Sequence, residues 1–248
     1  MRTDMPLRVV RQTEHDAVLF KPAGMSSEAP GPAAGGRAPA GAEGALSGGR
    51  APAAPRTLIE HARVQLGWPD AQLPHRLDRP TCGLVVVARD RQTVAAHNQN
   101  IREGRWHKVY VARMAAARMR DPSALVGRHT AYLRREGKVA RVVRSGGDPS
   151  ALVVLAVAPA PDRPGEVHAV IRLETGRFHQ IRAMMAALGA PLVGDADYSG
   201  PPGPFYLEHA SLTMPDAATG QAVRIFCAGE PARERLAPAV ASALASAG

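Results

Sequence analysis

Hydrophobic residues in this chain gather in short runs that are separated by turn-forming residues. Eight such runs are rich in β-branched residues and predict strands, at 17–21, 84–88, 108–112, 138–143, 151–157, 167–173, 208–213 and 222–226. Three further segments predict helices, at 57–66, 91–102 and 178–188. The strands predominate and do not alternate regularly with helices, as they would in a doubly wound parallel sheet. The pattern therefore indicates an α+β fold.

Two of the predicted helices carry local patterns with a structural meaning. Thr57 and Glu60 have the spacing of a capping box, which would start the helix at 57–66. In the helix at 178–188, Arg182 projects away from an apolar face and is free to meet a carboxylate. The residues that share this apolar face are Phe178, Ile181, Met185 and Leu188.

Two segments lack such a pattern. Residues 29–55 are almost wholly Ala, Gly, Pro, Ser and Arg, and cannot bury enough apolar surface to offset the entropy lost on ordering. They predict a disordered surface insert, with contact to a polyanion through Arg37 and Arg50 as the alternative. Residues 231–248 predict a tail with a loose, Ala-rich helix and no visible chemistry.

Composition narrows the class of protein. The 248 residues are 45% hydrophobic, which is normal for a globular protein and long enough for a substantial core. Lys and Arg outnumber Asp and Glu by 31 to 22, and this balance favours a polyanionic partner such as RNA, DNA or an acidic membrane surface. The two cysteines are too few for a disulfide framework or a zinc site. Without a signal-peptide pattern or an apolar run near 18 residues, we expect a cytoplasmic protein.

The segment from His75 to Ala88 carries the clearest chemistry. It places Asp78 between Arg76 and Arg79, on a loop with Pro and Gly that leads into a predicted strand. A carboxylate among cations stays ionised and acts only as an acceptor, which suits a nucleophile or a base. An exposed salt bridge would explain the same residues.

The sequence HRLDRPTCGLVVVAR at 75–89 closely resembles the catalytic motif of the RluA-like pseudouridine synthases. Cys82 stands where that family usually has Ser, and Ala183–Met184 stand where Val-His is common. Other family elements occur in the family's order, and together they cover nearly the whole chain. They are Lys-Pro-x-Gly at 21–24, Lys-x-Tyr-x-Ala at 108–112, Thr-Gly-Arg-x-His-Gln-Ile-Arg at 175–182, Gly-Asp-x-x-Tyr at 194–198 and Leu-Glu-His-Ala at 207–210.

The resemblance implies a particular architecture. We expect a single catalytic domain over 1–248, with its core at about 8–230. Its mixed, mostly antiparallel sheet would bend around a central cleft flanked by a few helices. About 16 residues precede the first predicted strand, so we expect no N-terminal S4 RNA-binding domain of the kind that many family members carry.

The resemblance also implies an activity, the isomerisation of specific uridines in ribosomal or transfer RNA to pseudouridine. This reaction breaks the C1′–N1 bond, turns the base and rejoins it through C5. Because the product is an isomer of the substrate, we expect no cofactor and no metal. The alternative from another class is a catalytically silent RNA-binding or ribosome-assembly protein with the same fold. A third alternative is a metal-dependent phosphoesterase that uses the dispersed His75, His179 and His209.

Three residues take catalytic roles by this resemblance. Asp78 is the nucleophile, although the residues do not decide whether it attacks C1′ or C6 or acts through a glycal. Arg182 pairs with it, lowers its pKa and fixes its direction. Tyr110 stacks on the target base and moves the proton from C5, which requires Lys108 or Arg182 to lower the pKa of the phenol.

Other residues are expected to bind the substrate. Arg76 would help to extrude the uridine and fill its space, while His75 and Thr81 shape the loop by hydrogen bonds. Lys108 would bind substrate, and Lys21 would contribute to the cleft wall. Basic residues cluster at 102–108 and again on a predicted hairpin through Glu136–Gly137 that could grip a phosphate backbone. The first cluster is Arg102, Arg105, His107 and Lys108, and the second is Arg134, Arg135, Lys138, Arg141 and Arg144. Without heptads or long apolar stretches, we expect a monomer.

Overall fold

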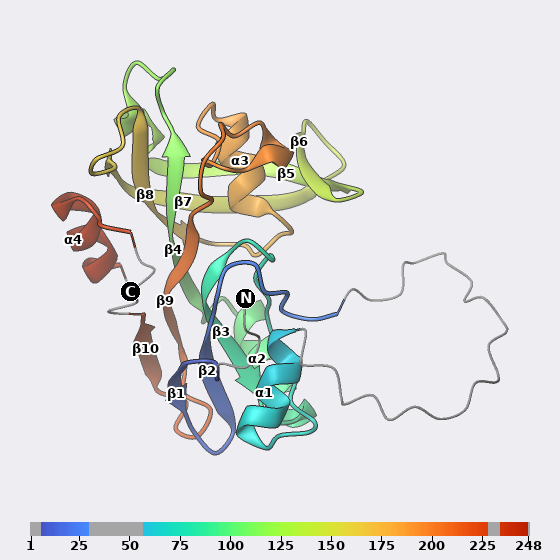
Figure 1. The fold of residues 1–248 in the computed structure, drawn as a ribbon. Coiled ribbons are helices and arrows are strands. Elements are labelled where there is room, and N and C mark those ends of the chain that lie inside the picture. The colour runs from blue at the N-terminus through green and yellow to red at the C-terminus, as the bar shows by residue number, and fades with distance from the viewer. Residues whose placement is uncertain (1–5, 30–56, 228–233, 248) are drawn as a thin grey trace, which may run out of the picture.

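The computed structural model describes residues 6–29, 57–227 and 234–247. Within these ranges, ten strands form one sheet in the order β1-β2-β3-β9-β4-β8-β7-β5-β6, and β10 pairs with β9 (Figure 1). All pairs are antiparallel except β3 with β9, so the predicted mixed, mostly antiparallel α+β fold is confirmed. The strands are β1 (Val9–Gln12), β2 (Asp16–Lys21), β3 (Cys82–Ala88), β4 (His107–Ala115), β5 (Gly127–Glu136), β6 (Val139–Val143), β7 (Asp148–Pro159), β8 (Glu166–Leu173), β9 (Leu207–Pro215) and β10 (Ala222–Phe226).

The described residues also form four α-helices, α1 (Leu58–Leu66), α2 (Arg91–Arg102), α3 (Gln180–Ala187) and α4 (Pro238–Ser246). The predicted capping box is present at α1. The Glu60 N–H donates to Thr57 Oγ1, and the Thr57 N–H donates to Glu60 Oε2. Helix α3 contacts β6, and α4 contacts β7 and β8.

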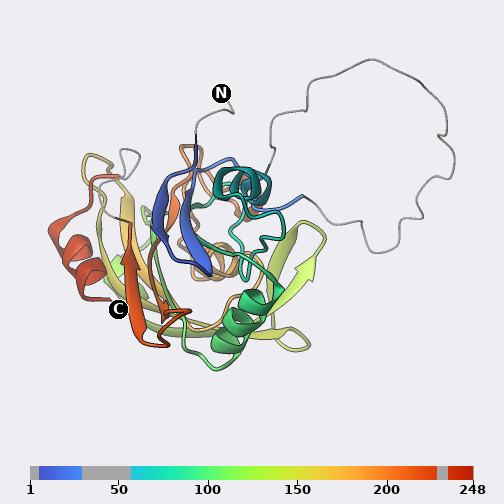
Figure 2. The ribbon, with the colours of Figure 1, turned by 90° about the horizontal axis from the view of Figure 1, so that it is seen from below.

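A short parallel seam between β3 and β9 joins two parts of the sheet. It consists of the pairs Cys82–Glu208 and Gly83–His209. A Cβ at Gly83 would lie 2.3 Å from the carbonyl oxygen of His209, and the φ of Gly83 is +115°, so this close approach requires glycine. Figure 2 shows that the sheet is curved. The seam therefore connects the part that carries Asp78 to the part that carries α3.

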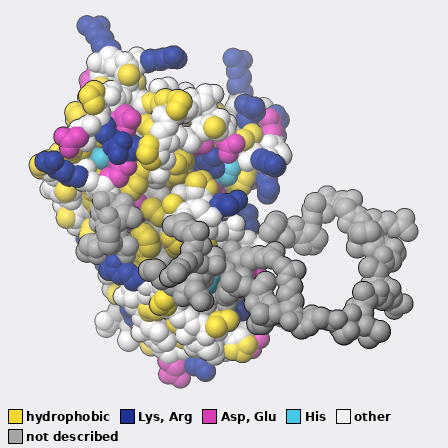
Figure 3. Space-filling model, viewed as in Figure 1, with side chains coloured by type: hydrophobic (Ala, Val, Ile, Leu, Met, Phe, Trp, Pro, Cys, Tyr) yellow, Lys and Arg dark blue, Asp and Glu magenta, His cyan; other side chains and the backbone are white. Residues whose placement is uncertain are grey.

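The hairpin of β5 and β6 bears the second predicted basic cluster. Arg134 and Arg141 both pair with Glu136, at 2.8 and 3.1 Å. The guanidinium of Arg135 lies over the ring of Phe178, 4.5 Å from its centroid. Figure 3 shows Lys and Arg side chains projecting from the upper part of one face, with acidic side chains among them. Part of the hairpin's positive charge is thus compensated within the protein.

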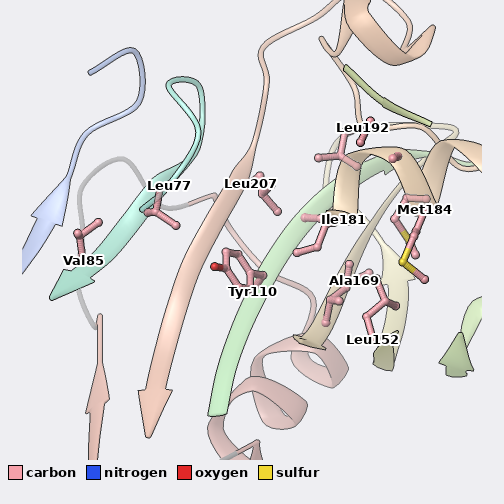
Figure 4. Close-up of a cluster of buried hydrophobic side chains, with 14 of the residues drawn as sticks. Leu77, Val85, Tyr110, Leu152, Ala169, Ile181, Met184, Leu192 and Leu207 are labelled. Atoms are coloured by element: carbon pink, nitrogen blue, oxygen red, sulfur yellow. The ribbon is translucent and has the colours of Figure 1, made fainter. Parts of the chain in front are cut away.

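The main hydrophobic core extends from the β2–β3 part of the sheet to the strands that face α3. In Figure 4, Tyr110 projects from β4 among Leu77, Leu207 and Ile181. The opposite face of β4 contributes Val109 and Val111 to a separate cluster with α4. The strand therefore presents alternate residues to its two faces, as predicted for residues 108–112.

Several predicted boundaries need correction. Strand β1 was not predicted, and β5 was predicted only as the first arm of the hairpin through Glu136–Gly137, which is present. In β5 only Leu133 of the ten residues is buried, so no hydrophobic run marks it. Helix α3 begins at Gln180 rather than 178, because His179 has a φ of 52°, in the left-handed region. Of the proposed insert at 29–55, only Ala29 lies within the described residues. In the predicted tail, α4 is a regular helix.

Candidate functional site

A cleft of about 920 Å³ is lined by the loop before β3, the end of α2, the start of β4 and the segment from β8 into α3. It brings together residues that are far apart in the sequence. The predicted site residues that line it are Asp78, Tyr110, Arg182, Arg76, His75, Thr81 and Lys108. Lys21 is not among the lining residues.

Asp78 is held on a tight turn at this cleft. The Thr81 N–H donates to the Asp78 backbone carbonyl at 3.1 Å. The Asp78 side chain is 26% exposed, and its Oδ2 lies 3.7 Å from Arg182 Nη1 and 3.7 Å from His179 Nε2. A carboxylate that is partly exposed at a cleft and faces a guanidinium can act directly on a bound molecule.

The pKa of Asp78 is raised above the usual range of an aspartate, because burial outweighs the nearby positive charges. The charge of Arg182 is the largest influence that lowers this pKa, and the charges of Arg76 and Lys21 also lower it. Arg182 thus lowers the pKa as expected, but burial raises it by more. A raised pKa makes the ionised carboxylate a better base than an ordinary exposed aspartate.

Arg182 links α3 to the loop that follows it. Its Nε and Nη2 each donate to a carboxylate oxygen of Asp195 at 2.7 Å, and Nη2 also donates to Asp197 Oδ2 at 2.9 Å. Arg182 is 4% exposed and Asp195 is 2% exposed, so this bidentate pair is buried. The contact with Asp78 that the sequence suggested is present, but the shortest contacts are with Asp195, which had no predicted role. The bidentate bond fixes the guanidinium with Nη1 toward Asp78.

His179 is a second neighbour of Asp78, and the sequence predicted no role for it beside this carboxylate. Arg182 Nη1 donates to His179 Nε2 at 2.8 Å, so Nδ1 carries the proton and donates to the Tyr198 hydroxyl oxygen at 3.0 Å. That oxygen also accepts from the Ala140 N–H at 2.7 Å. Burial and the charge of Arg182 lower the pKa of His179 to about 4, so its ring is neutral at pH 7. In the sequence it was marked by its place in the element at 175–182 and as one of three dispersed histidines.

Tyr110 packs its ring on the imidazole of His209, with the centroids 4.7 Å apart and the planes 17° apart. Burial and the negative charge of Asp78 raise the pKa of Tyr110. The expectation that Lys108 or Arg182 lowers the pKa of this phenol is therefore wrong. Tyr110 remains neutral near pH 7, which suits stacking and hydrogen-bond donation rather than action as a phenolate base.

The other predicted residues of the Asp78 loop have different surroundings. His75 accepts a hydrogen bond through Nε2 from the Val86 N–H at 3.0 Å, which fixes the loop to β3. Thr81 contributes its backbone bond, whereas its buried hydroxyl makes no hydrogen bond with a described residue. Arg76 is exposed at the cleft, where a bound molecule could reach it.

Lys21 contacts backbone rather than open space. Its side chain is fully buried, and Nζ donates to the carbonyl oxygens of Pro22, Met25 and Arg79 at 3.1, 2.8 and 3.2 Å. These bonds tie the segment after β2 to the loop that carries Asp78. The contacts support a positioning role for Lys21, in place of the predicted contact with substrate.

We expect the stability of the wild-type protein to rise relative to that of Lys21→Met between about pH 8 and pH 10.5. Burial lowers the pKa of Lys21 from 10.5 to about 8 in the folded chain. Between these values the unfolded chain binds more protons than the folded chain, so the free energy of unfolding increases with pH. Urea denaturation of both proteins across this range measures the difference. A difference that does not change with pH would contradict the lowered pKa of Lys21.

The described residues offer no arrangement of three or more His, Cys, Asp or Glu side chains that could hold a metal ion. Cys82 and Cys227 are not joined in a disulfide. In the described part of the chain, no helix has the length and apolar character needed to cross a membrane.

Curated proteins with similar sequences share one activity in their names. The dual-specificity RNA pseudouridine synthase RluA of Vibrio parahaemolyticus is 30% identical over 152 residues, 58% of this chain and 60% of the relative. The ribosomal large subunit pseudouridine synthase D of Pseudomonas aeruginosa is 32% identical over 197 residues, 79% of this chain and 55% of the relative. The chain thus spans less than two thirds of the length of these two relatives. RluA of Escherichia coli O6:H1 is 30% identical over 230 residues, 88% of this chain and 90% of the relative.

Solved structures show the same fold. Human RNA pseudouridylate synthase domain containing 1 has a TM-score of 0.64 at 21% identity, over 91% of this chain and 84% of that one. Human RNA pseudouridylate synthase domain containing 4 has a TM-score of 0.61 at 17% identity, over 96% and 91%. Residues 16–187 match the family model described as RNA pseudouridylate synthase. This match covers most of the chain and includes Asp78, Tyr110 and Arg182, and the chain therefore belongs to the RNA pseudouridylate synthase family.

Proposed function

We propose that this protein isomerises uridines in RNA to pseudouridine, with Asp78 as the nucleophile. The observation that carries the proposal is the partly exposed Asp78 carboxylate, which faces Arg182 at 3.7 Å in the cleft of a chain from this family. The substrate would be ribosomal or transfer RNA. The name of one relative, a ribosomal large subunit pseudouridine synthase, supports ribosomal RNA, and the name of another, a dual-specificity RNA pseudouridine synthase, supports an RNA substrate. The catalytic residues are Asp78, Arg182 and Tyr110.

The reaction conserves every atom of the nucleotide. The C1′–N1 bond breaks, C1′ bonds to C5, the C5 proton leaves and N1 takes up a proton. Asp78 must be ionised to attack, and Arg182 Nη1 at 3.7 Å favours that form. The neutral ring of His179, at the same distance, adds no further positive charge at pH 7.

The cleft can hold a nucleobase that has left the base stack of the RNA. Arg76 is exposed at the cleft and can occupy the space that an everted uridine vacates. One face of Tyr110 is covered by His209, and the part of Tyr110 that lines the cleft is available to the target base. His75 and Thr81 keep the loop beside this base, and Lys108 adds a positive charge to the wall.

We further propose that the described residues form one catalytic domain that acts as a monomer in the cytoplasm. The strand order, which runs from β1 to β6 without a break, supports a single unit. Gel filtration beside proteins of known mass tests the monomer. A dimer at micromolar concentration would contradict it.

Tritium release from RNA labelled at uridine C5 tests the activity. We expect wild-type protein to release tritium in proportion to the pseudouridine formed, and to do so equally well with EDTA. A catalytically silent RNA-binding protein would bind the RNA without release, and a metal-dependent phosphoesterase would lose activity in EDTA. Mapping pseudouridines in total RNA with and without the protein identifies the modified uridine. If every pseudouridine were still present without the protein, the proposal would be contradicted.

A further inference from the structure

Lys108 places an ammonium group in the cleft beside the proposed base site. It lies two residues before Tyr110 on β4, on the same face of the sheet, and both residues line the cleft. A Cβ at Gly176 would lie 3.2 Å from Lys108 Nζ, so the ammonium group lies close to the loop between β8 and α3. The absence of a side chain at Gly176 leaves room for this group.

The ammonium group of Lys108 has no partner among the described residues. None of their carboxylates lies within 4.0 Å of Nζ, and Nζ makes no hydrogen bond with them. Glu174, the other acidic residue in the cleft lining, pairs with Arg128 at 2.8 Å. Lys21 provides the contrast, because its three bonds to carbonyl oxygens occupy all of its donors.

A backbone N–H group in the loop near Lys108 is also available as a hydrogen-bond donor. The N–H of Gly176 makes no hydrogen bond with a described residue, and Gly176 is exposed at the cleft. An ammonium group that is partly removed from water gains from an anion that accepts several hydrogen bonds. Burial lowers the pKa of Lys108, which agrees with a charge that lacks compensation inside the protein.

We propose that Lys108 Nζ and the Gly176 N–H bind the phosphodiester adjacent to the everted uridine. This inference rests on the proposed function, since it takes RNA as the bound molecule. Two residues along a strand span about 6.6 Å, which matches the scale of one nucleotide between base and phosphate. The phosphate bound at Lys108 would therefore belong to the nucleotide whose base meets Tyr110, or to its immediate neighbour.

The same wall carries further positive groups for the strand that leads to this phosphate. Arg102 and His107 line the cleft and have no carboxylate partner within 4.0 Å among the described residues. On the hairpin, by contrast, the carboxylate of Glu136 pairs with both Arg134 and Arg141 and compensates part of their charge. The backbone of the RNA would thus follow the end of α2 and the start of β4 more closely than the hairpin.

A cycle that combines a protein change with an RNA change tests the contact. The probe is a nine-nucleotide RNA with one central uridine, carrying a neutral methylphosphonate 5′ or 3′ of that uridine. Binding is measured with Asp78→Asn as the parent protein, so that no turnover occurs. We expect Lys108→Gln to weaken binding of the unmodified RNA about tenfold or more, and to reduce the slope of log K against log salt by about 0.7.

At one of the two linkages, the methylphosphonate should weaken RNA binding by the parent protein by a similar factor. At the same linkage it should weaken RNA binding by the Lys108→Gln variant by less than about twofold. Lys108→Arg, which keeps the charge, should retain sensitivity to the methylphosphonate. Arg91→Gln is the matched control, because Arg91 is exposed at the opposite end of α2 and does not line the cleft. Equal thermal midpoints show that the variants are folded.

Full additivity of the two changes at both linkages would overturn the inference, as would an unchanged salt slope. Tritium release by the wild-type protein separates this failure from failure of the proposed function. If the wild-type protein releases tritium but the changes are additive, only the phosphate contact is wrong. If it releases none but the changes are coupled, the contact stands and the proposed activity is wrong.

Discussion

Replacing Asp78 with asparagine is expected to lower tritium release from uridine-labelled RNA by at least about a thousandfold. Asparagine keeps the size of the side chain but has no ionised oxygen to attack the nucleoside. The fold should be unaffected, because the side chain is 26% exposed and its pKa is already shifted toward the neutral form. Single-turnover kinetics with protein in excess measures the loss without a contribution from product release.

Asp70→Asn provides a matched control, since Asp70 is exposed in the turn after α1 and does not line the cleft. It should retain full activity. RNA binding by Asp78→Asn should stay within a fewfold of wild type, which places the defect in the chemical step. Retention of more than a tenth of the wild-type rate by Asp78→Asn would exclude the carboxylate as the nucleophile.

Replacing Arg182 with methionine is expected to lower the free energy of unfolding by about 3–5 kcal/mol, the cost of breaking a buried ion pair. The change leaves Asp195, which is 2% exposed, without the two bonds of 2.7 Å that compensate its charge. It also removes the donor that orients His179 and faces Asp78. Urea denaturation at pH 7 measures the stability, and tritium release should be lost together with it.

Two further variants identify the source of this effect. Arg76→Met removes an exposed arginine from the same cleft and should change stability by less than about 1 kcal/mol. Adding Asp195→Asn to Arg182→Met should restore part of the lost stability, because the uncompensated carboxylate is then gone. If Arg182→Met alone costs less than about 1 kcal/mol, the buried pair does not stabilise the fold.

The sequence predicted the elements whose hydrophobic residues occur in runs. Helix α2 was predicted at its observed bounds, and β3, which is buried along nearly its whole length, was found with a late start. The full extent of strand β5 was not predicted, because the strand is mostly exposed and carries Arg, His and Thr among its apolar residues. The order of the strands is not encoded in any local pattern, since β9 lies between β3 and β4.

The site could be predicted only as far as short motifs identify residue types. Asp78 and Arg182 were selected, and the structure brings them within 3.7 Å. The buried bonds of Arg182 to Asp195 could not be predicted, because they depend on how the loop after α3 folds back. The pKa of Tyr110 was misjudged for a similar reason, since burial outweighs neighbouring charges and burial is a property of the whole fold.

The seam of two residue pairs between β3 and β9 has a consequence for how the substrate range of such a protein can change. The His209 ring donates from Nδ1 to the Leu84 carbonyl oxygen at 2.6 Å and so reinforces the joint at its centre. Strands β1 and β6 form the two ends of the strand order, and neither takes part in this joint. Insertions at those outer edges would therefore change the ends of the sheet, while the spacing between Asp78 and Arg182 would be inherited unchanged.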